Sequence, residues 1–278
     1  MRALKTTFLL TALTLLLLFV GQAFGGRNGL TTALMFAVIM NGAAYFFSDK
    51  IALMSSGAVP ISREQAPRLY AVMERLASKA NLPMPRLYLI PQPAPNAFAT
   101  GRNPSHASVA VTEGLLQLMD DEELEGVIAH ELSHVRNYDI LTSSIAATIA
   151  GAITFLARMG FWFGGDDRDR EGGAIGALLM LILAPLAAML LQLGISRQRE
   201  YQADASGAQM VGHQYGLVRA LEKLGAYNKQ IPMDIAPSTS ALCIVAPKTA
   251  GEFVASLFST HPPLADRIAR LQQMTITR

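Results

Sequence analysis

Four long apolar segments alternate with polar stretches along this chain. Residues 6–24 and 30–47 lie close together near its start, and residues 140–157 and 174–194 form a second pair further on. A helix needs about 20 apolar residues to cross the hydrocarbon core of a bilayer, and each segment is close to that length. The pattern therefore predicts two helical membrane hairpins. The third segment is the least apolar, because hydroxyl side chains cluster near its start.

The first apolar segment also has an interpretation as a signal peptide. Arg2 and Lys5 precede it, and positive charge ahead of an apolar run is the pattern of a secretory signal. A second apolar segment follows almost at once, however, and a membrane hairpin explains the two together. We expect the hairpin, with the signal peptide as the alternative.

The polar stretches between the apolar segments are long enough to form one folded domain with its own core. We expect an N-terminal transmembrane hairpin (residues 1–47), the first half of that domain (48–139), a second transmembrane hairpin (140–194) and the second half of the domain (195–278). The two halves would then meet at the membrane surface, because each hairpin returns the chain to the side from which it left.

The first polar stretch combines helical and strand patterns. Residues 63–81 place apolar side chains at helical spacing. Three short β-like segments follow, at residues 86–90, 97–100 and 108–112. An Asp-x-x-Glu capping box at residues 120–123 then predicts the start of another helix. The expected fold is a mainly α membrane protein, with four transmembrane helices and an α+β domain that has a small β-sheet.

That last helix carries the sequence His-Glu-Leu-Ser-His at residues 130–134. Residues four apart lie on one face of a helix, so His130 and His134 are spaced to bind one Zn²⁺ ion. Glu131 would lie beside the metal, where it could act on a metal-bound water. The motif H-E-x-x-H also occurs by chance in unrelated chains, so alone it leaves the question open.

A catalytic zinc site needs a third protein ligand, and Glu200 is the best candidate. His134 lies just before the third apolar segment and Glu200 just after the fourth, so a membrane hairpin would return both to the same side. Asp204 would lie on the same helical face as Glu200 and could orient a ligating histidine by a hydrogen bond. The plainer alternatives are a surface carboxylate for Glu200 and an ion pair with Arg197 or another arginine for Asp204.

Composition and charge narrow the possible partners. The chain has 278 residues, 51% of them hydrophobic, which is high for a soluble protein. Its net charge of +2 is not clustered, so nothing indicates a nucleic-acid partner. The single cysteine, Cys243, excludes an internal disulfide and a metal site built from cysteines.

The distribution of positive charges predicts the orientation in the membrane. Arg2, Lys5 and Lys50 flank the first hairpin on one side, against Arg27 alone in its turn. Positive residues are enriched on the cytoplasmic side. The H-E-x-x-H motif is therefore expected to face the cytoplasm.

Together the motifs resemble those of the HtpX-type membrane zinc metalloproteases, which are related to the CAAX prenyl proteases. The similarity lies in the H-E-x-x-H helix that leads into a membrane span and in Arg-Glu-Tyr-Gln-Ala-Asp at residues 199–204 after a later span. Asn-Ala-Phe-Ala at residues 96–99 and Thr-His-Pro-Pro at residues 260–263 add to it. The motifs occur in the family's order and cover nearly the whole chain.

The resemblance implies a zincin-like protease domain in the cell inner membrane. His130, His134 and Glu200 would hold one zinc ion, and Glu131 would be the general base that deprotonates a zinc-activated water for attack on a peptide bond. The implied substrates are unfolded or damaged membrane proteins, and the implied setting is the lipid bilayer. The alternatives are a CAAX-type protease for prenylated substrates and a metal-binding membrane scaffold without hydrolysis.

Two further residues are candidates on the substrate side. His261 opens a His-Pro-Pro segment and could stabilise the oxyanion of peptide hydrolysis or simply precede a helix. The resemblance also implies a place near the metal for this histidine, as a transition-state donor or as an occasional fourth ligand. Asn96 precedes the strand at residues 97–100, which resembles the family's substrate-binding edge, and a peptide added to such an edge would bind through main-chain hydrogen bonds. His106 and His213 lie in predicted loops and are not assigned to the metal.

Overall fold

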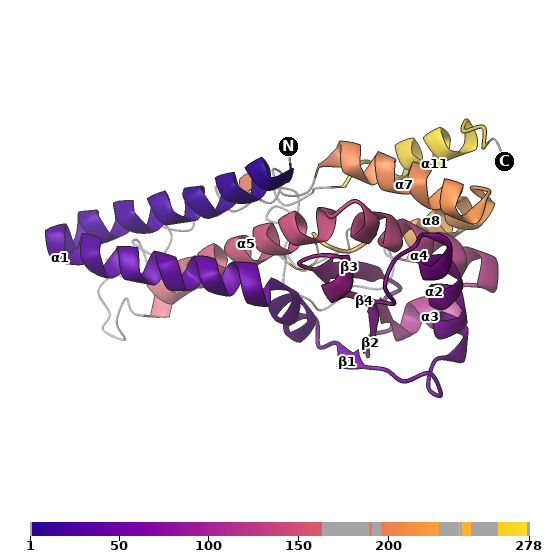
Figure 1. Cartoon of the computed structure of the whole chain (residues 1–278), viewed down its shortest axis with the longest axis horizontal. Coiled ribbons are helices and arrows are strands. Elements are labelled where there is room, and N and C mark those ends of the chain that lie inside the picture. The colour runs from indigo at the N-terminus through magenta and orange to yellow at the C-terminus, as the bar shows by residue number, and fades with distance from the viewer. Residues whose placement is uncertain are drawn as a thin grey trace.

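The computed structural model describes residues 2–162, 189–190, 196–227, 239, 241–245 and 261–276. The helices are α1 (Arg2–Ser55), α2 (Pro67–Lys79), α3 (Glu113–Leu118), α4 (Asp121–Arg136), α5 (Asp139–Trp162), α7 (Arg197–Val211), α8 (Tyr215–Tyr227) and α11 (Leu264–Gln272), with a 3₁₀ turn at Pro104–His106. The strands are β1 (Val59–Pro60), β2 (Arg86–Ile90), β3 (Ala97–Gly101) and β4 (Ala107–Thr112). Figure 1 shows an elongated molecule in which α1 extends away from a mixed body of helices and sheet.

The element α1 is a helical hairpin that turns back at Gly26. This residue has φ 54° and ψ −139°, a backbone conformation that glycine adopts at little cost. The two arms are in contact near the turn. They leave no room for a side chain at Gly21, where an added Cβ atom would collide with the carbonyl group of Gly29. The Asn41 side-chain amide of the second arm donates to the Thr14 hydroxyl of the first at 2.7 Å, and the arms diverge toward the body (Figure 1).

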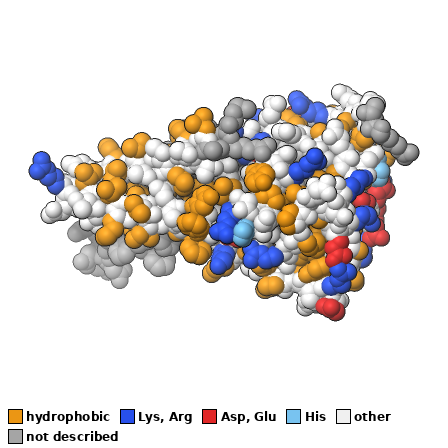
Figure 2. All heavy atoms as spheres, in the orientation of Figure 1, with side chains coloured by type: hydrophobic (Ala, Val, Ile, Leu, Met, Phe, Trp, Pro, Cys, Tyr) orange, Lys and Arg blue, Asp and Glu red, His pale blue; other side chains and the backbone are white. Residues whose placement is uncertain are grey.

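One helix of the described chain, Gly26–Ser55, is long and apolar enough to cross a membrane. Of the 18-residue apolar stretch of this helix, only 11% is buried within the protein. Figure 2 shows hydrophobic side chains along the outside of this arm. Leu4–Phe19 and Asp139–Ile153 are shorter apolar helices. Of the four predicted spans, the described residues thus contain one helix that is long and apolar enough to be a span, and the other three stay predictions. The fourth predicted segment, residues 174–194, lies almost wholly outside the described chain.

Helix α5 connects the apolar hairpin to the body. Its buried face packs on the first arm of α1, in a cluster that includes Leu9, Leu13, Ile145, Ile149 and Ile153. The hydroxyl groups of Thr6 and Thr142 lie 3.1 Å apart within this contact. On the body side, the hydroxyl groups of Thr100 in β3 and Ser144 in α5 lie 2.7 Å apart. Two of the hydroxyl side chains that make this segment less apolar, those of Thr142 and Ser144, therefore pair with other elements.

The predicted small sheet is present, with the strand order β1-β2-β4-β3. Strands β2 and β4 are parallel, whereas β1 pairs with β2 and β3 pairs with β4 in antiparallel fashion. The strand β3 therefore lies at an edge, where Ala99 pairs with Val109 on one side only. The strand β3 contacts α4, which carries the H-E-x-x-H motif, and α5.

Helix α4 lies at the centre of the body. Its start is fixed by the predicted capping box: the Glu123 N–H donates to the Asp120 side chain at 2.8 Å, and the Asp120 N–H donates to the Glu123 side chain at 2.9 Å. Its apolar side chains join a core to which α2, α7, α8 and the sheet all contribute. Residues from both polar stretches thus share one core, which brings α7 against α4.

Candidate metal centre

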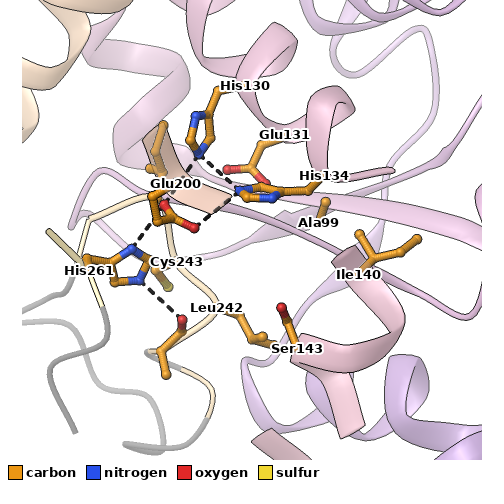
Figure 3. Close-up of a pocket in the computed structure, with 12 residues that line it drawn as sticks. Ala99, His130, Glu131, His134, Ile140, Ser143, Glu200, Leu242, Cys243 and His261 are labelled. Carbon is orange, nitrogen blue, oxygen red and sulfur yellow. Dashed lines mark hydrogen bonds and ion pairs between the residues drawn. The ribbon is translucent and has the colours of Figure 1, made fainter. Parts of the chain in front are cut away.

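The two histidines of the motif lie one helical turn apart in the C-terminal half of α4, with His134 in its last turn. Their Nε2 atoms are 3.2 Å apart, and their ring centroids are 4.8 Å apart. The His130 side chain is fully buried, and that of His134 is 16% exposed. Figure 3 shows both rings directed toward the same point as the side chain of Glu200.

Glu200 reaches this point from the first turn of α7. Its Oε1 atom lies 3.4 Å from Nε2 of His134, and its Oε2 atom lies 3.7 Å from Nε2 of His130. One ligand atom from each of the three residues lies within 4.8 Å of the other two. Glu200 can reach the histidines because α7 crosses α4 closely at Gly207, which has no side chain. A Cβ atom at Gly207 would lie 3.0 Å from the backbone nitrogen of His130.

This set of donors fits a catalytic metal ion. Two imidazole nitrogens and one carboxylate oxygen form a zinc ligand set that leaves a coordination position open. Glu131 adds a second indication, because its Oε1 atom is buried and has no hydrogen-bond partner among the described residues. A buried polar atom without a partner is costly, and beside these three donors it is placed to receive a hydrogen bond from water or substrate.

The charges of the site shift one another's protonation in the absence of a metal. Burial raises the pKa of Glu131 to about 7, with the Glu200 carboxylate acting in the same direction and His134 against it. Burial acts to lower the pKa of His134, but the nearby carboxylates, foremost Glu200, outweigh it and raise the pKa to about 9. Burial likewise opposes ionisation of Glu200, yet His261 and the two motif histidines hold its pKa well below the usual range.

Asp204 lies one turn after Glu200 on α7 and faces the outer nitrogen of His130. Its Oδ1 atom is 2.9 Å from Nδ1 of His130, the arrangement in which a carboxylate orients a ligating histidine. Asp204 also pairs with an arginine, but this is Arg267 of α11 and not Arg197. Burial acts to raise the pKa of Asp204, whereas Arg267 and His130 outweigh it and hold the pKa at about 2.

Arg267 is the main residue of the site that the sequence patterns did not indicate. Its Nε and Nη2 atoms donate to the two carboxylate oxygens of Asp204 at 2.8 and 2.6 Å. The side chain is fully buried. The only available signal was its position in the helix that follows the His-Pro-Pro segment, and nothing local distinguishes it there from Arg270.

His261 is directed at the candidate ligands. Its Nδ1 atom lies 3.2 Å from Oε2 of Glu200, and its Nε2 atom lies 3.2 Å from the carbonyl oxygen of Ala241. The ring thus borders the same cavity as the metal-ligand set (Figure 3). The other two histidines considered lie elsewhere: His106 contacts Arg102 and His213 pairs with Glu122.

Asn96 is placed differently from the substrate-facing position that the sequence suggested. Its side chain is fully buried, and its amide nitrogen donates to the carbonyl oxygen of Val245 at 2.9 Å. The Ile244 N–H donates to the Ala97 carbonyl oxygen at 2.9 Å. Asn96 therefore helps to hold residues 241–245 along the edge of β3, and we call these residues the wall segment.

A small cavity lies between the wall segment, β3, α4 and α5. The motif residues form one side of it, and the wall segment forms the other (Figure 3). Its lining residues are Ala99, His130, Glu131, His134, Ile140, Ser143, Glu200, Ala241, Leu242, Cys243, Ile244 and His261.

Comparisons with known proteins identify relatives of this chain. The sequence model of Peptidase family M48 matches residues 62–275. A protein named Protease HtpX homolog from Desulfatibacillum aliphaticivorans is 58% identical over 273 residues, covering 96% of this chain and 88% of the relative. Another of the same name from Pelotomaculum thermopropionicum is 49% identical over 282 residues, covering 99% and 100%.

A solved structure shares the fold at lower sequence identity. The crystal structure of Ste24p from S. mikatae aligns with a TM-score of 0.52 and 21% identity, covering 97% of this chain and 65% of that chain. This likeness concerns the fold alone, and the present chain spans less than two thirds of the Ste24p chain. The family match extends over most of the sequence and the relatives align nearly end to end, so the chain belongs to peptidase family M48 and is a metalloprotease.

Proposed function

We propose that this protein is a membrane-bound zinc endopeptidase in which His130, His134 and Glu200 bind one zinc ion and Glu131 is the general base. The observation that carries the proposal is the convergence of these three donors next to a buried carboxylate oxygen that has no partner in the described chain. Membership of a metalloprotease family supports it independently.

A zinc ion held by these residues would supply Lewis acidity, which polarises a peptide carbonyl and makes water a stronger acid. Glu131 supplies the proton transfer. Its carboxylate is held by the buried C-terminal half of α4. It takes a proton from the attacking water and returns it to the leaving amine. His261 borders the same cavity, and we propose that it donates to the oxyanion that forms at the carbonyl in place of its present contact with the Ala241 carbonyl oxygen.

The edge of β3 is the proposed binding surface for the peptide substrate. Alternate residues of an edge strand direct their N–H and C=O groups outward. Ala97 is one of these, since its carbonyl accepts from Ile244 across the edge. Ala99 is then the next, and it lines the cavity beside Glu131. A substrate that adds as a strand here binds through its main chain, which suits a protease with broad sequence preference.

The position of the site relative to the apolar helices suggests the kind of substrate. Helix α5 begins at Asp139, immediately after the end of α4, and packs on the apolar hairpin. The cavity includes Ile140 and Ser143 of α5. We infer that the site lies at the inner-membrane surface and faces the cytoplasm, and that unfolded or damaged membrane proteins are its substrates in a quality-control role.

The proposal is tested by replacing Glu131 with Gln in the full-length, detergent-solubilised protein. Zinc-loaded wild type should cleave an unfolded protein substrate, whereas Glu131→Gln should be about 10²- to 10⁴-fold slower with unchanged zinc content. Glu125→Gln is the matched control, because Glu125 lies on the same helix and pairs with Arg75 away from the site. A Glu131→Gln variant that cleaves as fast as wild type would refute the assignment of the base.

A further inference from the structure

Arg267 is a fully buried arginine whose guanidinium group connects two parts of the active site. Burying a charged side chain is expensive unless its donors are satisfied. Here Nε and Nη2 donate to both oxygens of Asp204 at 2.8 and 2.6 Å, and Nη1 donates to the carbonyl oxygen of Ile244 at 2.7 Å. The planar group thus bonds a carboxylate and a backbone carbonyl at the same time, which a lysine side chain cannot do in this geometry.

The first connection leads to the candidate zinc ligand His130. The Oδ1 atom of Asp204 lies 2.6 Å from Nη2 of Arg267 and 2.9 Å from Nδ1 of His130. Arg267 Nη2 and His130 Nδ1 are themselves only 3.4 Å apart, as two donors that share one acceptor oxygen. The bidentate contact fixes the plane of the carboxylate, and that plane determines where Oδ1 meets the imidazole. Arg267 therefore restricts the rotation of the His130 ring through Asp204.

The second connection leads to the proposed substrate edge. Ile244 accepts from Arg267 through its carbonyl group and donates through its N–H group to Ala97 of β3. Its side chain and those of its neighbours in the wall segment line the cavity opposite the motif. The same guanidinium group thus fixes the distance between the metal-ligand set and the wall segment.

We propose that Arg267 is a positioning residue: it orients His130 through Asp204 and holds the wall segment against β3 through Ile244. Its Nη1 atom lies 4.0 Å from Oε2 of Glu200, beyond hydrogen-bond distance, and its Nη2 atom approaches His130 at Nδ1, which is not the nitrogen that faces His134 and Glu200. The inference rests on the proposed zinc centre. Its alternative is that Arg267 only stabilises the fold, as a buried ion pair with no effect on the site.

Zinc retention separates these two roles without relying on catalysis. The full-length protein is prepared with Glu131→Gln to prevent self-cleavage, and zinc affinity is measured by competition with a chromophoric chelator on samples whose folded state is matched by circular dichroism. Loss of a carboxylate–histidine support weakens metal affinity by about 10- to 100-fold, and we expect this for Arg267→Lys and Arg267→Gln. Arg270→Gln is the control, since Arg270 lies on the same helix but stacks on the Tyr201 ring.

The inference fails if Arg267→Lys binds zinc as tightly as the parent protein, or if Arg270→Gln loses as much affinity. A double-mutant cycle tests the route through Asp204. If Arg267 acts through Asp204, the variant carrying both Asp204→Asn and Arg267→Gln should lose no more than the weaker-binding single variant. Losses that multiply would contradict that route. If Arg267→Gln alone does not fold, the zinc affinity of Asp204→Asn is compared with that of the double variant. The double variant avoids the unpaired buried carboxylate that Arg267→Gln alone would leave.

The contact with Ile244 is tested by steady-state kinetics with intact Glu131. Asp204→Asn leaves that contact in place, so it should lower kcat without raising KM for a peptide substrate. Arg267→Lys should lower kcat and raise KM as well, because the wall segment and the β3 edge lose their fixed spacing. Equal KM values for the two variants would refute the second connection. If the wild type binds no zinc and cleaves nothing, the proposed function fails. If the wild type binds zinc and cleaves the substrate, and the Arg267 variants match it in zinc affinity and kinetics, this inference alone fails.

Discussion

The Nε2 atom of His134 lies 3.4 Å from the Oε1 atom of Glu200, although the two residues belong to different polar parts of the chain. Helix packing produces this proximity. Helix α7 crosses α4 closely at Gly207, whose missing side chain leaves room for the backbone of His130. The position of the third proposed ligand therefore depends on one tight contact between two helices, which leads to the first prediction.

Replacing Gly207 with Val should destabilise the protein and weaken zinc binding together. The added side chain would have to displace the backbone of α4, and overpacking of this kind costs about 1–3 kcal/mol in the free energy of unfolding. The shift would also move Glu200 away from the histidine pair. Ser206→Val is the control for placing a β-branched side chain in this helix, because Ser206 precedes Gly207 and is half-buried. Thermal unfolding and zinc titration that match this control would contradict the prediction.

His261 should contribute to catalysis more than to metal binding. It faces Glu200 at 3.2 Å and borders the cavity, where loss of an oxyanion donor lowers kcat by about 10²- to 10³-fold. We expect this loss for His261→Asn in a peptide-cleavage assay, with zinc content unchanged. His213→Asn, at a histidine that pairs with Glu122, should retain wild-type activity. A His261→Asn variant with normal kcat, or one without zinc, would show that His261 has a different role.

Cys243 should be unreactive in the folded protein over the pH range in which ordinary thiols ionise. Burial raises the pKa of its thiol, and the nearby Glu131 carboxylate acts in the same direction. Because the raised pKa keeps the thiol protonated, alkylation should stay slow between pH 7 and 9.5. In denaturant the rate should rise with pH through the usual thiol pKa of about 8.5. Mass spectrometry after timed alkylation measures both. Native alkylation that speeds up near pH 8.5 would show that the wall segment is open.

The sequence patterns predicted the parts of the structure that depend on local signals. The Asp120–Glu123 capping box, the small sheet and the spacing of His130 and His134 are all local. The position of Glu200 could be anticipated only because the apolar segments on either side suggested a hairpin that returns the chain.

What the patterns could not provide are contacts between segments without a local signal. Arg267 looks like any other helical arginine until α11 is placed against α7. Asn96 was interpreted as facing substrate, yet its amide binds Val245, because the wall segment occupies that part of the β3 edge. Such long-range partners depend on tertiary packing, which no spacing of residues along the chain reveals.

The most direct test of the metal centre is the zinc affinity of Glu200→Gln in the inactive Glu131→Gln protein. The amide keeps the size of the side chain but removes its charge and its strength as a ligand, so metal affinity should fall by at least about tenfold. Glu222→Gln, at an exposed position of α8, should bind one zinc ion per chain as the parent protein does. A Glu200→Gln variant that binds zinc with the parent affinity would contradict the proposal that α4 and α7 together form the catalytic metal site.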